Sequence, residues 1–530
     1  MRLSCFITLA FLILSTSLKG QKEGLETINK NDLKAHMTFF ASDGMKGRET
    51  GTPENDLAAL YLRTNIMRIG LRPISETEEF LQKVPLESSE IKAGETYIKV
   101  KNASGADIYT NDSIIYLMAP FNTLESSSNF VFAGYGFADS TMGYDDYKGI
   151  ELKDKVVMMM TGRPDVSDPD QLNSVFSIET ERPKIMAAFS QGVKAVLYVY
   201  DPRGKYSDAY ASGLADMGFS RVGTRIMSLK AFEGSSPVQV AFITRYTADQ
   251  LLKKTGQNLK SIQEKIINEK KPASFEMNDI MVTFRTYIEH TTISVNNVIG
   301  IVEGSDPVLK NECVVYTAHF DHIGVNKDGQ VFNGADDNAS GSMSLLEVAQ
   351  AFMKLKKKPL RSIVFAWVNG EEKGLLGSQF YVSNPVYPME KTLMDINLDM
   401  VGRSKMPSDT GKFMGLNVKV SQQGEILIYT DQKGQDILEL IKSRSQETGI
   451  IAINMGKDPI LGSSDYASFM DRGVPVICFN SAEFHSDLHK TGDDVETIDF
   501  DKMEKVSKMA FLIGYDIANQ KKRFVPDTIK

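Results

Sequence analysis

The sequence that decides the fold is VVYTAHFDHIG at residues 314–324, followed by NGADDNASG at residues 333–341. The first segment opens with an apolar run, which predicts a buried strand that ends in histidine and aspartate. The second opens an amphipathic stretch whose apolar residues recur at helical spacing. Because α/β proteins place reactive groups just beyond the carboxyl ends of strands, we expect a polar site in this loop.

The same pattern of an apolar strand followed by acidic residues recurs further along the chain. An apolar run leads into Glu371 and Glu372, and another leads into Asp399. Predicted strands lie at 296–303, 313–318, 361–368, 394–400, 424–430 and 474–479, and predicted helices at 339–356, 374–382, 434–447, 464–472 and 499–518. This alternation predicts an α/β fold with a mostly parallel sheet that is covered by helices on both faces.

Length and composition limit the class of protein. At 530 residues the chain is expected to form two or three domains, and its 42% apolar and 24% charged content is typical of soluble globular proteins. The net charge of −8 argues against a nucleic-acid partner, because phosphate binding needs a basic surface.

The first twenty residues predict a secretory signal peptide. Arg2 gives a positive start, residues 3–14 are almost wholly apolar, and residues 15–20 are small and polar. About a dozen apolar residues are too few to span a bilayer. A buried N-terminal strand or helix is the alternative. We expect an exported protein, periplasmic or extracellular, without a membrane span.

The rest of the chain divides into three predicted parts. Residues 21–104 begin with a helical pattern and are expected to pack on the α/β domain, which spans residues 286–530. Residues 105–285 are β-rich and contain no histidine. Without a plausible ligand set, this inserted part is expected to be a lid or a substrate-positioning domain.

The polar residues at the strand ends have the side-chain chemistry of zinc ligands. They are His319, the pair Asp336-Asp337, the pair Glu371-Glu372, Asp399 and His489. Each has an ordinary explanation by itself, such as an acidic helix start or a surface acidic pair. Because all lie on loops of one domain, we expect them to hold two metal ions ~3.5–4 Å apart, with one carboxylate shared and one glutamate left as general base.

These motifs resemble, in the same order, those of the M28 family of zinc metallopeptidases, which includes secreted bacterial aminopeptidases. The resemblance covers about residues 290–518 and depends on HFDH, GADDNASG, NGEEKGLLGS, NLDM and HKTGD. GRETGT at residues 47–52 resembles the N-terminal segment of larger members. GYG at 134–136 and YDDYKG at 144–149 resemble their inserted protease-associated domain.

The resemblance implies a ligand set for two zinc ions. Asp336 would bridge both ions, Glu372 and His489 would complete one site, and His319 and Asp399 the other. It also implies that the peptide bond between Asp336 and Asp337 is cis.

The resemblance also implies catalytic roles. Glu371 would activate a metal-bridging water as the general base, and Asp321 would orient His319. Many relatives have an oxyanion-stabilising tyrosine just before the final histidine, where this chain has Leu488. We predict Tyr466 as a substitute, with simple packing as the alternative.

The implied function is that of a secreted metallo-aminopeptidase, a zinc-dependent exopeptidase that hydrolyses the N-terminal bond of peptides and proteins. A carboxypeptidase or a dipeptidase on the same metal core is the alternative within the class. A metal-free receptor or scaffold is the alternative outside it, and it would lack ligands that this chain has.

Overall fold

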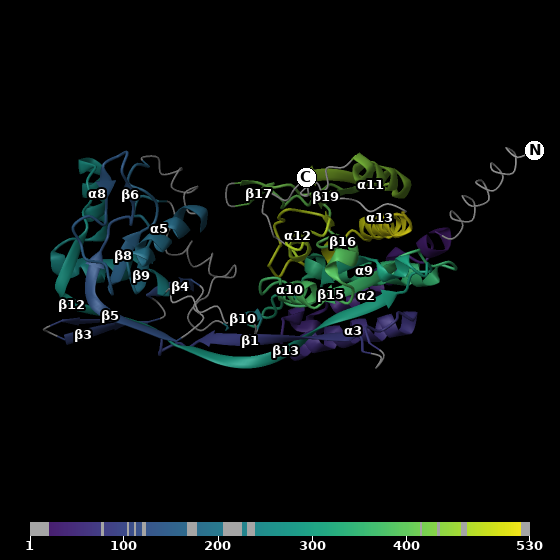
Figure 1. The fold of residues 1–530 in the computed structure, drawn as a ribbon, viewed down its shortest axis with the longest axis horizontal. Coiled ribbons are helices and arrows are strands. Elements are labelled where there is room, and N and C mark those ends of the chain that lie inside the picture. The colour runs from purple at the N-terminus through teal and green to yellow at the C-terminus, as the bar shows by residue number, and fades with distance from the viewer. Residues whose placement is uncertain are drawn as a thin grey trace, which may run out of the picture. The chain divides into compact units, whose positions relative to one another are not determined.

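A computed structural model describes residues 21–520 except for gaps at 76–78, 103–104, 111–112, 119–122, 167–177, 205–224, 230–238, 414–415, 432–434 and 457–463. The predicted signal peptide therefore lies outside the described residues. The chain forms two compact units, labelled by element in Figure 1. One contains the described residues up to Leu86 and from Ile293 on, and the other is Glu87–Thr292. The inserted unit thus begins earlier and ends later than the predicted 105–285.

The first unit is built on a mixed sheet with the strand order β1-β13-β15-β14-β16-β21-β19-β20. Strands β14, β15, β16 and β21 are parallel neighbours, as are β19 and β20, whereas β13 and β19 run antiparallel to β15 and β21. The α/β fold is therefore confirmed, and the predicted parallel arrangement holds for β15, β14, β16 and β21. The strands are β1 (Leu81–Ile91), β13 (Ile288–Val302), β14 (Cys313–His319), β15 (Ser362–Val368), β16 (Thr392–Leu398), β19 (Glu425–Thr430), β20 (Ile451–Gly456) and β21 (Val476–Asn480), with a short hairpin of β17 (Lys412–Phe413) and β18 (Leu416–Asn417).

Helices cover both faces of this sheet (Figure 1). Alternate residues of β14 show why its sequence is a continuous apolar run. Val314 and Tyr316 pack in a core with residues of α9 and α13, and Cys313 and Val315 pack with residues of α10 and α12. The helices are α2 (Lys30–Phe40), α3 (Pro53–Ile69), α9 (Gly341–Lys354), α10 (Leu376–Ser383), α11 (Gln435–Thr448), α12 (Tyr466–Met470) and α13 (Phe500–Asn519). No helix in the described ranges combines the length and the apolar character that crossing a membrane requires.

The second unit is β-rich, as predicted, and has the strand order β3-β2-β12-β5-β8-β9-β11-β4. Strands β5, β8, β9 and β11 are parallel, and their buried residues form the core of this unit. Its main elements are β2 (Tyr97–Asn102), β3 (Gly105–Tyr109), β4 (Ile114–Met118), β5 (Leu124–Phe132), β8 (Val156–Met160), β9 (Ala195–Val199), β11 (Gln239–Ile243), β12 (Phe275–Thr286), α5 (Ile178–Ser190), α7 (Arg245–Leu252) and α8 (Leu259–Glu269); β6 (Ala138–Asp139), β7 (Tyr144–Asp145) and β10 (Arg225–Leu229) are short.

Candidate metal centre

The carboxyl ends of β14, β15 and β16 bring the predicted site residues together. His319 is the last residue of β14, Glu371 and Glu372 follow β15, and Asp399 follows β16 directly. Because these three strands are parallel neighbours, their ends meet at one edge of the sheet.

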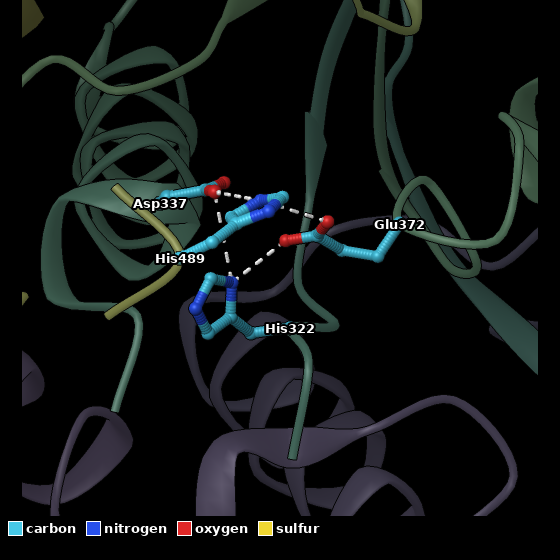
Figure 2. Close-up of side chains that lie close together, drawn as sticks. All are labelled: His322, Asp337, Glu372 and His489. Atoms are coloured by element: carbon cyan, nitrogen blue, oxygen red, sulfur yellow. Dashed lines mark hydrogen bonds and ion pairs between the residues drawn. The ribbon is translucent and has the colours of Figure 1, made fainter. Parts of the chain in front are cut away.

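A first cluster consists of His322, Asp337, Glu372 and His489, whose ligand atoms all lie within 4.8 Å of one another (Figure 2). His489 Nε2 lies 3.1 Å from Asp337 Oδ2 and 3.1 Å from Glu372 Oε2. His322 Nδ1 lies 2.7 Å from Glu372 Oε1. The loop that contains His489 comes much later in the sequence, between β21 and α13.

A second cluster consists of His319, Glu371 and Asp399. His319 Nε2 lies 3.3 Å from Asp399 Oδ1 and 3.4 Å from Asp337 Oδ1. The two carboxylate oxygens of Asp337 therefore face different clusters. Oδ1 faces His319 of the second cluster, and Oδ2 faces His489 of the first. This is the position that a carboxylate shared by two metal ions would take.

In the structure Asp337 lies between the two clusters, whereas the resemblance implied Asp336 at this position. Asp336 is fully buried with its side chain turned away, and its Oδ1 accepts hydrogen bonds from Gly402 N at 2.7 Å and Ser340 Oγ at 3.2 Å. Asp337 has φ −103° and ψ 97°, which interrupts the helical turn Ala335–Ser340. The two adjacent side chains therefore point to different surroundings.

Contacts with distant segments hold this turn in place. The Asp493 carboxylate accepts hydrogen bonds from Asp336 N at 2.8 Å and Asp337 N at 3.0 Å. The cis peptide bond lies between Asp337 and Asn338, one bond after the position that the resemblance implied. At Gly341 a Cβ atom would lie 2.1 Å from the Leu398 carbonyl oxygen, so glycine is needed where α9 begins against β16.

Asp321 lies beside His319, but its carboxylate has a different main contact from the predicted one. His319 Nδ1 lies 3.2 Å from the Asp321 carbonyl oxygen and 3.8 Å from its carboxylate. The carboxylate instead accepts hydrogen bonds from Glu371 N at 3.2 Å and Glu372 N at 3.4 Å. The Asp321 backbone is thus the closer partner of the imidazole, and its side chain holds the two glutamates.

Two further residues differ from their expected surroundings. Tyr466 is buried in the apolar core with Phe469 and Val476, which is the arrangement expected from packing; an oxyanion role for it stays a prediction. His322, which sequence reasoning made a neighbour of the ligands, belongs to the first cluster through its contact with Glu372. In the sequence, the position of His322 three residues after His319 was the indication that it could join the cluster.

Charge pairing dominates the electrostatics of the centre. Glu372 raises the pKa of His489 to about 12. Burial opposes ionisation of Glu372, but the charge of His489 together with the charge and hydrogen bond of His322 outweighs it and lowers the Glu372 pKa to about 2. Burial raises the pKa of the Glu371 carboxyl well above its usual range. The His489 imidazole therefore pairs with an anionic Glu372 carboxylate, and a divalent cation would replace its proton.

The residues fit a pair of zinc ions. Imidazole nitrogen and carboxylate oxygen are zinc ligands, and both types converge in each cluster. Asp399 Oδ1 is buried without a hydrogen-bond partner, which is costly unless another group satisfies it. A cation between His319, Asp337 and Asp399 would satisfy the Asp399 oxygen.

Comparisons with known proteins agree with this geometry. Residues 297–513 match the model of peptidase family M28. The chain is 28% identical over 235 residues to leucine aminopeptidase 1 of Sclerotinia sclerotiorum, covering 42% of this chain and 56% of that protein. It is 25% identical over 335 residues to a probable zinc metalloprotease of Pyrenophora tritici-repentis, covering 55% of this chain and 67% of that protein. The chain thus spans just over half the length of the first of these relatives.

Solved structures share the fold along nearly the whole chain. An aminopeptidase from Aneurinibacillus sp. superposes with a TM-score of 0.57 at 20% identity, covering 96% of this chain and 98% of that one. A zinc aminopeptidase from Bacillus subtilis superposes with a TM-score of 0.52 at 17% identity, covering 94% and 98%. At these identities the likeness concerns the fold.

Proposed function

Since residues 297–513 belong to peptidase family M28, we propose that the protein is a zinc-dependent aminopeptidase that binds two zinc ions per chain. The observation that carries the proposal is the position of Asp337, whose two oxygens lie 3.4 Å from His319 Nε2 and 3.1 Å from His489 Nε2. One carboxylate between two imidazole-containing clusters is the arrangement that a two-metal hydrolase requires.

The ligand roles follow from the two clusters. His319 and Asp399 would hold one ion, Glu372 and His489 the other, and Asp337 both. Zinc, when bound, would act as a Lewis acid toward the scissile carbonyl and the attacking water. His322 would orient Glu372, because its Nδ1 lies 2.7 Å from Glu372 Oε1.

Glu371 is the proposed general base. It lies in the second cluster with His319 and Asp399, and its backbone N–H is fixed by Asp321 Oδ1 at 3.2 Å. Its carboxylate would take a proton from the attacking water and transfer the proton to the departing amine. The water oxygen forms the new bond to the carbonyl carbon as the carbon–nitrogen bond breaks.

The substrates would be the N-termini of peptides and proteins, by analogy with the aminopeptidases that the chain resembles. We further propose that residues 1–20 direct export and are removed. The unit Glu87–Thr292 would be a protease-associated domain that positions substrates; its β-rich core supports this assignment.

A substrate panel tests the function. Purified protein with two equivalents of zinc is incubated with amino-acid anilides, free dipeptides and the matching N-acetylated dipeptides. We expect anilide hydrolysis, no cleavage of acetylated substrates, loss of activity with a chelator, and recovery with zinc. Release of the C-terminal residue from the acetylated dipeptides would instead identify a carboxypeptidase. Zinc-loaded protein that cleaves no member of the panel would refute the proposal.

A further inference from the structure

The N-terminal loop at residues 47–52, GRETGT, lies outside the residues that match the family, yet it contacts the loops that bear the ligands. Gly47 has φ +64°, and a Cβ there would lie 2.4 Å from the Phe332 carbonyl oxygen and 2.6 Å from that of Gly324. Only glycine allows this approach to the segment between the two ligand loops.

Arg48 joins these loops through backbone carbonyls. Its guanidinium is fully buried and donates from Nε to Phe320 O at 2.9 Å, from Nη1 to Asn333 O at 2.7 Å, and from Nη2 to Gly334 O at 3.0 Å. Nη1 also donates to Phe40 O at 2.8 Å, at the end of α2. Phe320 follows the ligand His319, and Gly334 precedes the turn that presents Asp337. The rigid, planar guanidinium group of Arg48 therefore fixes the two ligand loops relative to each other.

Thr50 reaches the third ligand loop. Its Oγ1 donates to Asp321 Oδ2 at 2.9 Å, and the same carboxylate accepts the backbone N–H groups of Glu371 and Glu372. Lys373 Nζ lies 2.8 Å from Glu49 Oε1, which is a second link between the N-terminal loop and this segment. The hydroxyl thus fixes a carboxylate that in turn fixes the proposed base and a proposed ligand.

We propose that Arg48 and Thr50 are positioning residues of the metal centre. Arg48 sets the spacing between the His319 and Asp337 loops, and Thr50 sets the placement of Glu371 and Glu372. The inference rests on the proposed zinc centre. Packing alone would not require Arg48 to donate hydrogen bonds to backbone carbonyls of both ligand loops. A lysine ammonium group is too compact to reach the same four carbonyl oxygens.

The first test compares Arg48→Lys with Arg361→Lys. Arg361 is also buried in the same unit, but it precedes β15 at the opposite edge of the sheet and donates to Glu312 Oε2 at 2.7 Å. Zinc affinity is measured by competition with a chelator, and stability by denaturant unfolding. We expect both variants to be destabilised and only Arg48→Lys to bind zinc about 10- to 100-fold more weakly. Parental zinc affinity in Arg48→Lys, or an equal loss in Arg361→Lys, would overturn the role of Arg48.

The second test uses a gentler change. Thr50→Val removes the hydroxyl at nearly constant volume, Thr50→Ser retains it, and Thr430→Val removes a buried hydroxyl that donates to Val476 O at 2.8 Å, away from the centre. With zinc bound, we expect Thr50→Val to lose about tenfold in kcat at unchanged KM. Thr50→Ser and Thr430→Val should match the parent. Parental kcat in Thr50→Val would refute the role of Thr50, whereas a parent protein that binds no zinc would refute the proposed function instead.

Discussion

Replacing Asp337 by asparagine should abolish metal binding, whereas replacing Asp336 by asparagine should change it little. In Asp337→Asn, an amide replaces the carboxylate whose oxygens lie 3.4 Å from His319 Nε2 and 3.1 Å from His489 Nε2. Both clusters then lose an anionic ligand. In Asp336→Asn, Oδ1 can still accept from Gly402 N, and the new amide group faces His485 Nε2, 3.7 Å from the present Oδ2. Burial lowers the pKa of His485 to about 4, and its Nδ1 accepts a hydrogen bond from Asp487 N at 3.2 Å, so the neutral ring carries its proton on Nε2 and the new amide gains no acceptor there.

The magnitudes follow from these contacts. Residues that only orient metal ligands are worth about 10- to 100-fold in affinity, so loss of a direct ligand should cost at least ~100-fold for each ion. That is about 2.8 kcal/mol per ion, because each factor of ten is about 1.4 kcal/mol. Asp336→Asn retains its main hydrogen bond and should cost less than about tenfold.

The assay is zinc content after dialysis against a chelator of graded strength, measured by elemental mass spectrometry. We expect the parent and Asp336→Asn to retain two ions under conditions in which Asp337→Asn retains none. Circular dichroism controls for folding in each variant. Retention of zinc by Asp337→Asn together with its loss from Asp336→Asn would return the shared role to Asp336 and refute the geometric reasoning.

Three further outcomes are expected. Glu371→Gln should keep both zinc ions and lose about 10²- to 10⁴-fold in kcat, since only proton transfer is removed; near-parental turnover would exclude Glu371 as the base. Zinc at about a hundred times its Kd should raise the unfolding free energy of the metal-free protein by about 2.7 kcal/mol for each of the two sites, and an unchanged unfolding curve would contradict a folded-state site. In the inserted unit, burial raises the pKa of Asp146 to about 6, so its folded form binds a proton more tightly than its unfolded form and its contribution to stability falls as pH rises from about 4 to about 6. The unfolding free energy of the parent minus that of Asp146→Asn should therefore drop by up to about 3 kcal/mol over this range, whereas a difference that rises with pH would reverse the assignment.

The buried strands of the first unit could be predicted because both faces of its sheet are covered, whereas β20, whose residues are partly exposed, lies outside the predicted strands. Residues on both sides of β14 are buried, so the strand appears in the sequence as an unbroken apolar run. The boundaries of the inserted unit were harder to predict, because β1 and β13 continue through them without a break. The helical pattern with which residues 21–104 begin ends before Leu81, where β1 begins.

The site could be predicted as a set of loops but not atom by atom. The choice between Asp336 and Asp337 depends on Gly402 N and the Asp493 carboxylate, which lie 66 and 157 positions from Asp336 in the sequence. No local periodicity contains that information. The N-terminal loop shows the same limit, since the partners of Arg48 at Phe320 and Gly334 lie 272 and 286 positions away.

These long-range contacts also explain how a turn with an irregular backbone can present a ligand accurately. The turn Ala335–Ser340 has non-helical dihedrals at Asp337 and Asn338, and hydrogen bonds from other segments add to its own, such as Ser340 Oγ to Asp336 O at 2.7 Å. Asp493 holds its N–H groups, and Asn338 Nδ2 ties it to Leu398 O at 3.0 Å, one residue before Asp399. Each of these hydrogen bonds involves a segment that contains or adjoins a proposed ligand. Displacing one ligand loop therefore displaces the supports of the next, so the metal centre should lose its geometry as a unit and not one ligand at a time.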